Sequence, residues 1–503
     1  MPINTPPKSY DDAAVKWKRC RDCFEGSDAV KAAGPEYLPP LGSHDNTPKG
    51  RAQYAAYKAR ALFYNATART VQGLAGLIFQ KVPTFELTPA IEGHEQDITM
   101  AEESAELFAL HATEEVLTTG RYGVLVEMSA AGESPSRPYW VGYKAEDVCS
   151  YRTERRGGEQ VLARVVLKES YWEPDPDDEF KEDEVTQFRV LSLGDEDSGY
   201  SLNDSIFASG DDNKRYYRQT IYREEEKSGE WLPVEEYVPT RRAEALDFIP
   251  FIIIGPTSVT PEISKPPLLD LVDVNLSHYR GSADLKHGLH KVALPQPWAS
   301  GIQGAGTDDG AITIGPSVVW MLDSGGRAGM VEFTGAGLGA IRTDQLDQQA
   351  LMATLGARLL EEGGGPPETA TAVRMKHAGE NATIRTIAAS METGLTQVFQ
   401  WHAWWAGTEE DPKSVEAGIE LNKDFFSQRA TPDDVKAAML LWQSGGISFE
   451  TFYHNLEQGE WTRPGVDAEE EHQELVAEGV ADPGPVDIEE EVVEEEVVEV
   501  EAE

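Results

Sequence analysis

The stretch PLLDLVDVNLSHYRGSADLKHGLHKV, residues 267–292, has the apolar spacing of a long helix. A stretch broken by Gly and Pro, with strand character, follows over 293–333, and a second helical pattern covers 339–362. The breaker Gly363-Gly364-Gly365-Pro366-Pro367 separates it from a third, very long helical pattern over 369–405. These patterns predict a rod with a tip, and they contain no catalytic constellation.

The chain is large and strongly acidic. Its 503 residues, 40% of them hydrophobic, are enough for several domains with a sizeable core. It has 88 acidic and 44 basic residues, a net charge of −44. Such a surface repels phosphate backbones, so tight DNA binding by the chain as a whole is disfavoured. The tail over 467–503 has 17 acidic residues and no Lys or Arg, a composition typical of disorder.

Cysteine content and hydropathy indicate the expected compartment. The chain has three cysteines, Cys20, Cys23 and Cys149. This number is small and odd, which argues against a disulfide framework. The first residues lack the apolar core of a secretion signal, and no apolar run approaches the roughly 18 residues that cross a bilayer. We therefore expect a reduced, intracellular protein without a membrane segment.

The N-terminal part begins with helical patterns. A short amphipathic helix is expected over 11–26, followed by a loop over 27–50 that is dense in Pro and Gly. From residue 51, apolar residues recur every three or four positions up to Ile78, which predicts one helix of about seven turns. A further helix is predicted over 100–119, with Gly120 ending it.

The periodicity then becomes that of strands. Short β-rich runs without intervening helices predict an antiparallel meander, and these runs cover 122–128, 139–143, 161–171, 185–193, 215–223, 231–238 and 248–254. Two acidic connections, 173–184 and 194–213, lack the spacing and the glycine of an EF-hand, so they are interpreted as solvated loops. After the long helices, an extended piece over 417–425 and helices over 433–443 and 449–457, with Ser448 as the N-cap, complete the chain.

One glycine motif suggests a ligand. Gly335, Gly337 and Ala340 fit G-x-G-x-x-A after an extended run and before a helix, the context of a pyrophosphate at a helix N-terminus. No second parallel strand follows to complete a βαβ unit. We therefore favour a bend between tip and rod, made by Gly335, Gly337 and Gly339, and keep a nucleotide-binding enzyme as an unlikely alternative.

The other motifs have structural explanations. Cys20 and Cys23 have redox spacing but lie in a charged helix without a preceding strand, so a helix face is favoured. His287 and His290 lie between two lysines at the end of a helix. Positively charged side chains are favourable at a helix C-terminus, so we prefer this interpretation to a zinc-binding pair. The sequence has neither G-x-S-x-G nor a P-loop. These observations predict no enzyme activity, no cofactor and no metal.

Four stretches together resemble the tailed-bacteriophage portal (head-tail connector) proteins, in a branch often described only as a phage domain of unknown function. They are RALFYNATARTV (60–71), PPLLDLVDVNLSHYRGSADLKHGLH (266–290), EFTGAGLGAIR (332–342) and GGISFET (445–451). The resemblance covers about residues 10–470. It implies a ring, usually of twelve subunits, at one capsid vertex of the virion, through which DNA is packaged and ejected.

The resemblance also implies an α+β fold with a defined order of parts. These are an antiparallel-β and helical wing (1–263), a first stem helix (264–292), a clip (293–335), a second stem helix (336–362), a tunnel loop (363–369), a long wing helix (370–407), a crown (408–466) and the acidic disordered tail (467–503). The implied partners are further copies of the chain, the terminase packaging motor, head-tail adaptors, major capsid or scaffold protein, and double-stranded DNA that passes without tight binding. Assembly would take place in the host cytoplasm.

The charge suits a conduit. An acidic wall repels a polyanion such as DNA and keeps the friction in a passage low. Scattered cations on the second and third long helices would then touch phosphates, and the candidates are Arg342, Arg358, Arg374 and Lys376. The other structural alternative is an acidic virion assembly or tail-interface protein without a channel.

Overall fold

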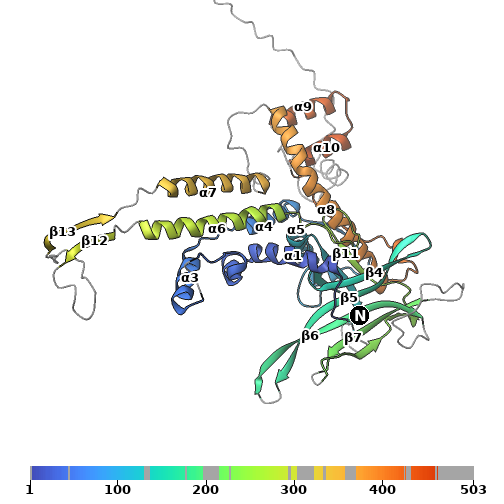
Figure 1. Ribbon diagram of the computed structural model, residues 1–503. Helices are drawn as coiled ribbons and strands as arrows, with labels where there is room; N and C mark the ends of the chain where they lie inside the picture. Colours follow the sequence, from blue (N-terminus) through green and yellow to red (C-terminus); the bar gives the residue numbers. More distant parts are fainter. Residues whose placement is uncertain are drawn as a thin grey trace, which may run out of the picture. The chain divides into compact units, whose positions relative to one another are not determined.

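The computed structural model describes residues 3–42, 46–129, 136–175, 178–195, 215–225, 228–292, 296–302, 322–331, 336–356, 370–423, 425, 432–458 and 461–462, with backbone only at some positions, chiefly 370–382. The chain forms two compact units, Met1–Lys423 and Asp424–Glu503, each described by itself. It combines helices with antiparallel sheets, which confirms the predicted α+β class (Figure 1).

The N-terminal helices differ from the predicted pattern in two places. The first, α1 (Lys8–Glu25), matches its prediction. The predicted loop over 27–50 is wrong in part, because it contains α2 (Ser27–Ala32), the turn η1 (Gly34–Glu36) and the start of α3 (Pro48–Arg60). The predicted single helix from residue 51 to residue 78 is also wrong: α3 ends at Arg60, and α4 (Ala66–Ile78) begins anew.

Side chains of a helix far along the sequence stabilise the break between α3 and α4. Ser282 Oγ accepts a hydrogen bond from the Leu62 backbone N–H at 3.0 Å and donates one to the Leu62 carbonyl at 2.6 Å. Asn275 donates to the Tyr64 carbonyl and accepts from Thr67. Asn65 then caps α4 by accepting from the Ala68 N–H. The apolar spacing continues through the break because both helices face one core, so spacing alone could not show it.

Two antiparallel sheets follow α5 (Ala105–Thr119), which ends at Gly120 in the left-handed conformation as predicted. One sheet has the order β11-β2-β3, from Phe251–Ile254, Tyr122–Met128 and Pro138–Lys144. The other is a five-stranded meander of β4 (Val148–Arg156), β5 (Glu159–Asp175), β6 (Asp178–Asp195), β7 (Arg215–Glu224) and β8 (Trp231–Tyr237). The predicted antiparallel meander is confirmed for the runs over 161–238, although β4 was missed. The runs over 122–128, 139–143 and 248–254 are not part of it, because they form the separate three-stranded sheet in which β11 pairs with β2.

The acidic connection over 173–184 was predicted to be a loop, and this prediction is wrong because the segment is part of a hairpin. Strands β5 and β6 continue into it, with Glu173 opposite Asp183. The second connection, 194–213, lies outside the described residues except for its start at the end of β6. Smaller pairs are β1 (Thr84–Glu86) with β14 (Gly418–Glu420) and β9 (Thr240–Arg241) with β10 (Glu244–Ala245). Short turns are η2 (His94–Gln96) and η4 (Pro412–Ser414).

The long helices appear where the sequence predicts them. They are α6 (Leu269–Val292), α7 (Ala336–Leu355) and α8 (Ala370–Ala406), with β12 (Gln296–Ile302) and β13 (Leu322–Val331) between the first two. The remainder of the predicted second stem helix, 357–362, lies outside the described residues. On α8, Ile387, Met391 and Leu395 are buried at successive helical turns, as the apolar spacing requires. None of the described helices is both long and apolar enough to cross a membrane.

In the second unit, α9 (Pro432–Gln443) and α10 (Phe449–Gln458) form a helical hairpin. Trp442 stacks on Phe452 with ring centroids 5.0 Å apart. Ser448 Oγ accepts from the Thr451 N–H, which confirms the predicted N-cap. Residues 408–423, the start of the crown that the resemblance implies, lie in the first unit, where β14 pairs with β1.

Candidate functional site

The α6–α7 helix pair is the rod predicted from the sequence. Successive contacts place Gly288 against Leu338, Gly281 against Gln345 and Leu271 against Gly356. From one contact to the next, the residue number in α6 falls by about as much as the number in or next to α7 rises. The two helices are therefore antiparallel and keep a single register along the pair. Figure 1 shows the two helices side by side.

Glycines on α6 allow this close approach. A Cβ added at Gly288 would lie 2.5 Å from Leu338 Cδ2, and one added at Gly281 would overlap the buried side chain of Gln345. Glycine in a helix interior costs about 0.5–1 kcal/mol relative to alanine, so it needs a packing reason. Their separation of seven residues puts both on one face of α6. Sequence reasoning missed this pair, although two glycines seven apart in a helical pattern are a readable signal.

Polar contacts add specificity to the pair. Gln348 lies 3.3 Å from Ser277 Oγ, and Gln349 lies 3.1 Å from His278 Nε2. At the end of α7, an added Cβ at Gly356 would lie 2.7 Å from Thr70 Cγ2, so α7 also approaches α4 closely. The rod is therefore anchored to the N-terminal helices at this end.

The tip between the helices is an antiparallel β12–β13 hairpin. Trp298 lies opposite Gly329, whose added Cβ would lie 2.9 Å from the indole nitrogen. Trp298 and the neighbouring Met330 are 44% and 62% exposed. Large apolar side chains exposed on a small projecting element are typical of a docking surface.

The structure places only some of the predicted site residues. Gly337 and Gly339 lie in the first turns of α7, so they belong to the helix and not to the predicted bend. Arg342 is exposed on α7. Three predictions lie outside the described residues: Gly335 of the bend, Arg358, and the tunnel loop Gly363-Gly364-Gly365-Pro366-Pro367. Arg374 and Lys376 lie on α8, where only the backbone is described.

The nucleotide-binding alternative loses its structural context. Strand β13 pairs antiparallel with β12, and α7 returns along α6 and does not cross over to a parallel strand. A βαβ unit, which holds a pyrophosphate, is therefore not formed by the described part of this segment.

The cysteine and histidine motifs lie in packed surroundings. Cys20 and Cys23 are buried in one apolar cluster with α6, and burial raises the pKa of Cys20 to about 12. Both are free thiols, as the helix-face interpretation requires. His287 packs edge-on against Tyr57, with ring centroids 5.3 Å apart. Within the described ranges, no group of three or more metal-ligating side chains comes together.

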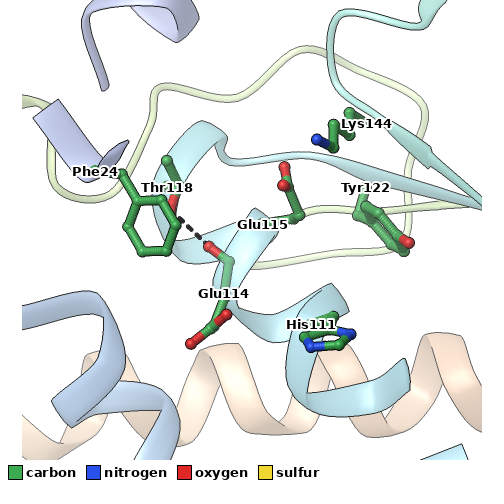
Figure 2. Close-up of a pocket in the computed structure, with 7 residues that line it drawn as sticks. All are labelled: Phe24, His111, Glu114, Glu115, Thr118, Tyr122 and Lys144. Carbon is green, nitrogen blue, oxygen red and sulfur yellow. Dashed lines mark hydrogen bonds between the residues drawn. The ribbon is translucent and has the colours of Figure 1, made fainter. Parts of the chain in front are cut away.

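A pocket of about 250 Å³ lies beside α5, lined by Phe24, His111, Glu114, Glu115, Thr118, Tyr122 and Lys144 (Figure 2). Burial raises the pKa of Glu114. Glu115 is held by Arg21 at 2.9 Å, and Thr118 Oγ1 donates to the Glu114 carbonyl, the dashed line of Figure 2. No nucleophile is hydrogen-bonded to a base among these residues, so the pocket supports no specific reaction.

A histidine pair joins α8 to η2. His402 is fully buried, and its Nε2 lies 2.9 Å from His94 Nδ1. Arg137 and Glu95 also act on the pair, and Arg137 is itself paired with Asp97 at 2.6 Å. Burial first, and then His94 and Arg137, lowers the pKa of His402 to about 3. Burial likewise lowers the pKa of His94.

This pair predicts a loss of stability in acid. Because the pKa of His402 is lower in the folded chain than in the unfolded one, its contribution is complete above about pH 6.5 and declines as pH falls toward 3. At pH 5 this group alone should reduce the free energy of unfolding by about 2 kcal/mol relative to pH 7. Urea unfolding at both pH values should show a smaller difference for His402→Gln. The exposed-histidine control His111→Gln should keep the wild-type difference, and equal differences for all three proteins would contradict the assignment.

Known proteins resemble this chain in part. Residues 267–406, from the start of α6 to the end of α8, match a family described as Domain of unknown function (DUF4055). No curated protein is significantly similar to the chain.

Solved structures align over most of the chain at low identity. The virion of the native gene transfer agent (GTA) particle is 12% identical, covering 85% of this chain and 98% of that chain, with a TM-score of 0.37. The neck of the empty GTA particle, computed with C6 symmetry, is 13% identical, with coverages of 85% and 99% and a TM-score of 0.36. The neck of the native particle, computed with C12 symmetry, is 11% identical, with coverages of 84% and 98% and a TM-score of 0.36. TM-scores this low assign no function.

Proposed function

We propose that this chain is a structural component of a phage-type virion and, more specifically, a portal protein that forms a ring around a DNA channel. The α6–α7 pair is the observation on which the proposal rests. It is a long antiparallel rod with one fixed register, joined at one end by a hairpin that exposes Trp298 and Met330. A ring needs rods that pack on their neighbours as well as on their own chain.

The motifs in the sequence that resemble portal proteins assign roles to these parts. Helices α6 and α7 would be the stem and the β12–β13 hairpin the clip that meets the packaging motor and then the tail adaptor. The sheets would belong to the wing, 363–369 would be the tunnel loop, and α9 and α10 would belong to the crown. The net charge of −44 suits a channel that DNA crosses without being held. Arg342, exposed on α7, is the described candidate for a passing phosphate contact.

Electron microscopy of the purified chain tests the proposal. We expect end-on views of a closed ring with a central hole, and mass photometry should give about twelve times the 55.3 kDa subunit mass, as the resemblance implies. A monomer at high concentration would contradict the ring. Oligomers without a hole would favour the other virion role, that of an acidic assembly or tail-interface protein.

A further inference from the structure

One segment of this acidic chain contains no acid. From Asn46 to Phe85 the sequence has no Asp or Glu, although such residues number 88 in 503 overall. The same segment has six cations, namely Lys49, Arg51, Lys58, Arg60, Arg69 and Lys81. None of the six is within ion-pair distance of a carboxylate among the residues that the structure describes, whereas Arg19, Arg21 and Arg137 are each paired. This positive charge lacks a partner in the described part of one subunit.

Helix α3 presents much of this charge on an orderly surface. Its buried side has Tyr57, whose hydroxyl donates to Asp284 of α6 at 2.6 Å. At 3.6 residues per turn, Lys49 and Arg60 border one edge of that side, and Arg51 and Lys58 border the other. The outward side between them consists of small side chains, the exposed Ala52, Ala55 and Ala59. The outward side of α3 is therefore flat, apolar in the middle and cationic at both edges.

A second feature has the opposite character. Strand β5 pairs with β4 only up to Leu167, and β6 pairs with β7 only from Gln187 onward. Beyond Tyr171, whose ring lies under the Arg223 guanidinium at 4.4 Å, the hairpin extends as a two-stranded arm, described over residues 172–175 and 178–184 (Figure 1). An isolated two-stranded ribbon is only marginally stable in water, so a partner would stabilise the arm.

The arm is acidic and has exposed aromatic side chains. The sequence over 172–184 includes eight acids and one lysine. That lysine, Lys181, is already neutralised within the arm by Asp175 at 2.7 Å and by Asp183 at 3.3 Å. Trp172 is 62% exposed and Phe180 is 89% exposed. Exposed aromatic groups beside uncompensated charge are typical of a protein interface.

We propose that the arm of one copy binds across the outward side of α3 of a second copy. The two surfaces have opposite charge, and the alanines of α3 leave room for Trp172 and Phe180, which can also stack on the bordering cations. Both surfaces are exposed within one chain, so the contact is between copies. Two different patches in contact make a head-to-tail interface, and such an interface builds a ring when the rotation between neighbouring copies closes. The inference thus deepens the proposed ring and rests on it.

Matched charge reversals test this contact. One variant has Lys49→Glu and Lys58→Glu on α3, and the other has Glu173→Lys and Glu184→Lys on the arm. We expect each alone to need a roughly tenfold higher concentration for assembly than the wild type, because like charges then meet. An equal mixture of the two should assemble at the wild-type concentration, since each reversed surface finds an opposite one on the other variant. The control Lys8→Glu with Lys16→Glu, an equal charge change on exposed lysines of α1, should assemble normally.

Each outcome decides between the proposals. Wild-type rings with unchanged assembly of both reversed variants would overturn the arm contact and leave the proposed ring standing. A wild-type chain that never assembles would contradict both. If the α3 variant assembled normally but lost retention of a 100-base-pair DNA in gel shifts, the cations would serve DNA, and the arm contact would be overturned. Failure of the mixture to recover would also overturn it.

Discussion

Replacing Arg189 with methionine is expected to lower the free energy of unfolding by about 3–5 kcal/mol. Arg189 on β6 donates to Glu127 of β2 and to Glu169 of β5, both at 2.7 Å. The three side chains are at most 16% exposed. Removing the guanidinium leaves two carboxylates at a poorly solvated site without their counter-charge, and that desolvation cost dominates the effect.

The surrounding network explains why these carboxylates cannot simply turn to water. Gln219 Nε2 donates to Glu127 at 2.9 Å, and the Tyr143 hydroxyl donates to Glu169 at 2.7 Å. These contacts hold the acids between the two sheets, because Glu127 belongs to the three-stranded sheet and Arg189 to the five-stranded one. The ion pairs therefore connect the sheets as well as neutralise charge.

Urea unfolding followed by tryptophan fluorescence would measure the loss. The control Arg156→Met removes a pair with Asp247 whose side chains are 42% and 66% exposed, so it should change stability by less than about 1 kcal/mol. Adding Glu127→Gln and Glu169→Gln to Arg189→Met should restore most of the stability, because neutral amides need no counter-charge. A loss below about 1 kcal/mol for Arg189→Met alone would show that water solvates the site.

Replacing Gly281 and Gly288 together with leucine is expected to separate α6 from α7 and to abolish ring assembly. The register puts the buried Gln345 and the half-buried Leu338 where the new side chains must go. Overpacking costs about 1–3 kcal/mol at each site, while loss of a helical glycine returns up to about 1 kcal/mol each. The net effect is destabilising, and it falls on the proposed channel wall.

A glycine in the same rod supplies the control. Gly339 lies in α7, and an added Cβ there would meet no atom within 4 Å, so Gly339→Ala should be neutral or stabilise by up to about 1 kcal/mol. Gly288→Leu combined with Leu338→Ala should recover part of the loss, because the two sites are in direct contact. Mass photometry and urea unfolding would record both effects. Normal rings from the double leucine variant would disprove the importance of the close helix approach.

Much of the fold could be predicted because the periodic spacing of apolar residues identifies long helices and strands. Helices α6 and α8 and strand β2 lie where the pattern puts them. The division between α3 and α4 was missed because it depends on Asn275 and Ser282, which lie more than 200 residues away. The acidic end of the β5–β6 hairpin was taken for a loop, since charge counts against strand propensity but does not prevent cross-strand pairing.

The site was predictable in outline and not in detail. Order along the chain predicts two long helices and a β tip, whereas the glycine contacts depend on which faces meet. Gly337 and Gly339 were assigned to a bend because glycine is commonest in turns, yet both lie in α7. The tunnel-loop residues remain a prediction.

Helix α6 has two sets of partners, and both repeat after seven residues. Asn275 and Ser282 make hydrogen bonds to the break between α3 and α4, while Gly281 and Gly288 allow α7 to pack closely. Inserting a single residue between Gly281 and Ser282 would turn the two halves of the helix by about 100° relative to each other and change both spacings at once. Homologues of this chain should therefore keep the length of α6 between residues 275 and 288 constant and place their insertions in the segment between β12 and β13. The spacing of the contact residues on α6 thus limits which parts of the chain can change in length.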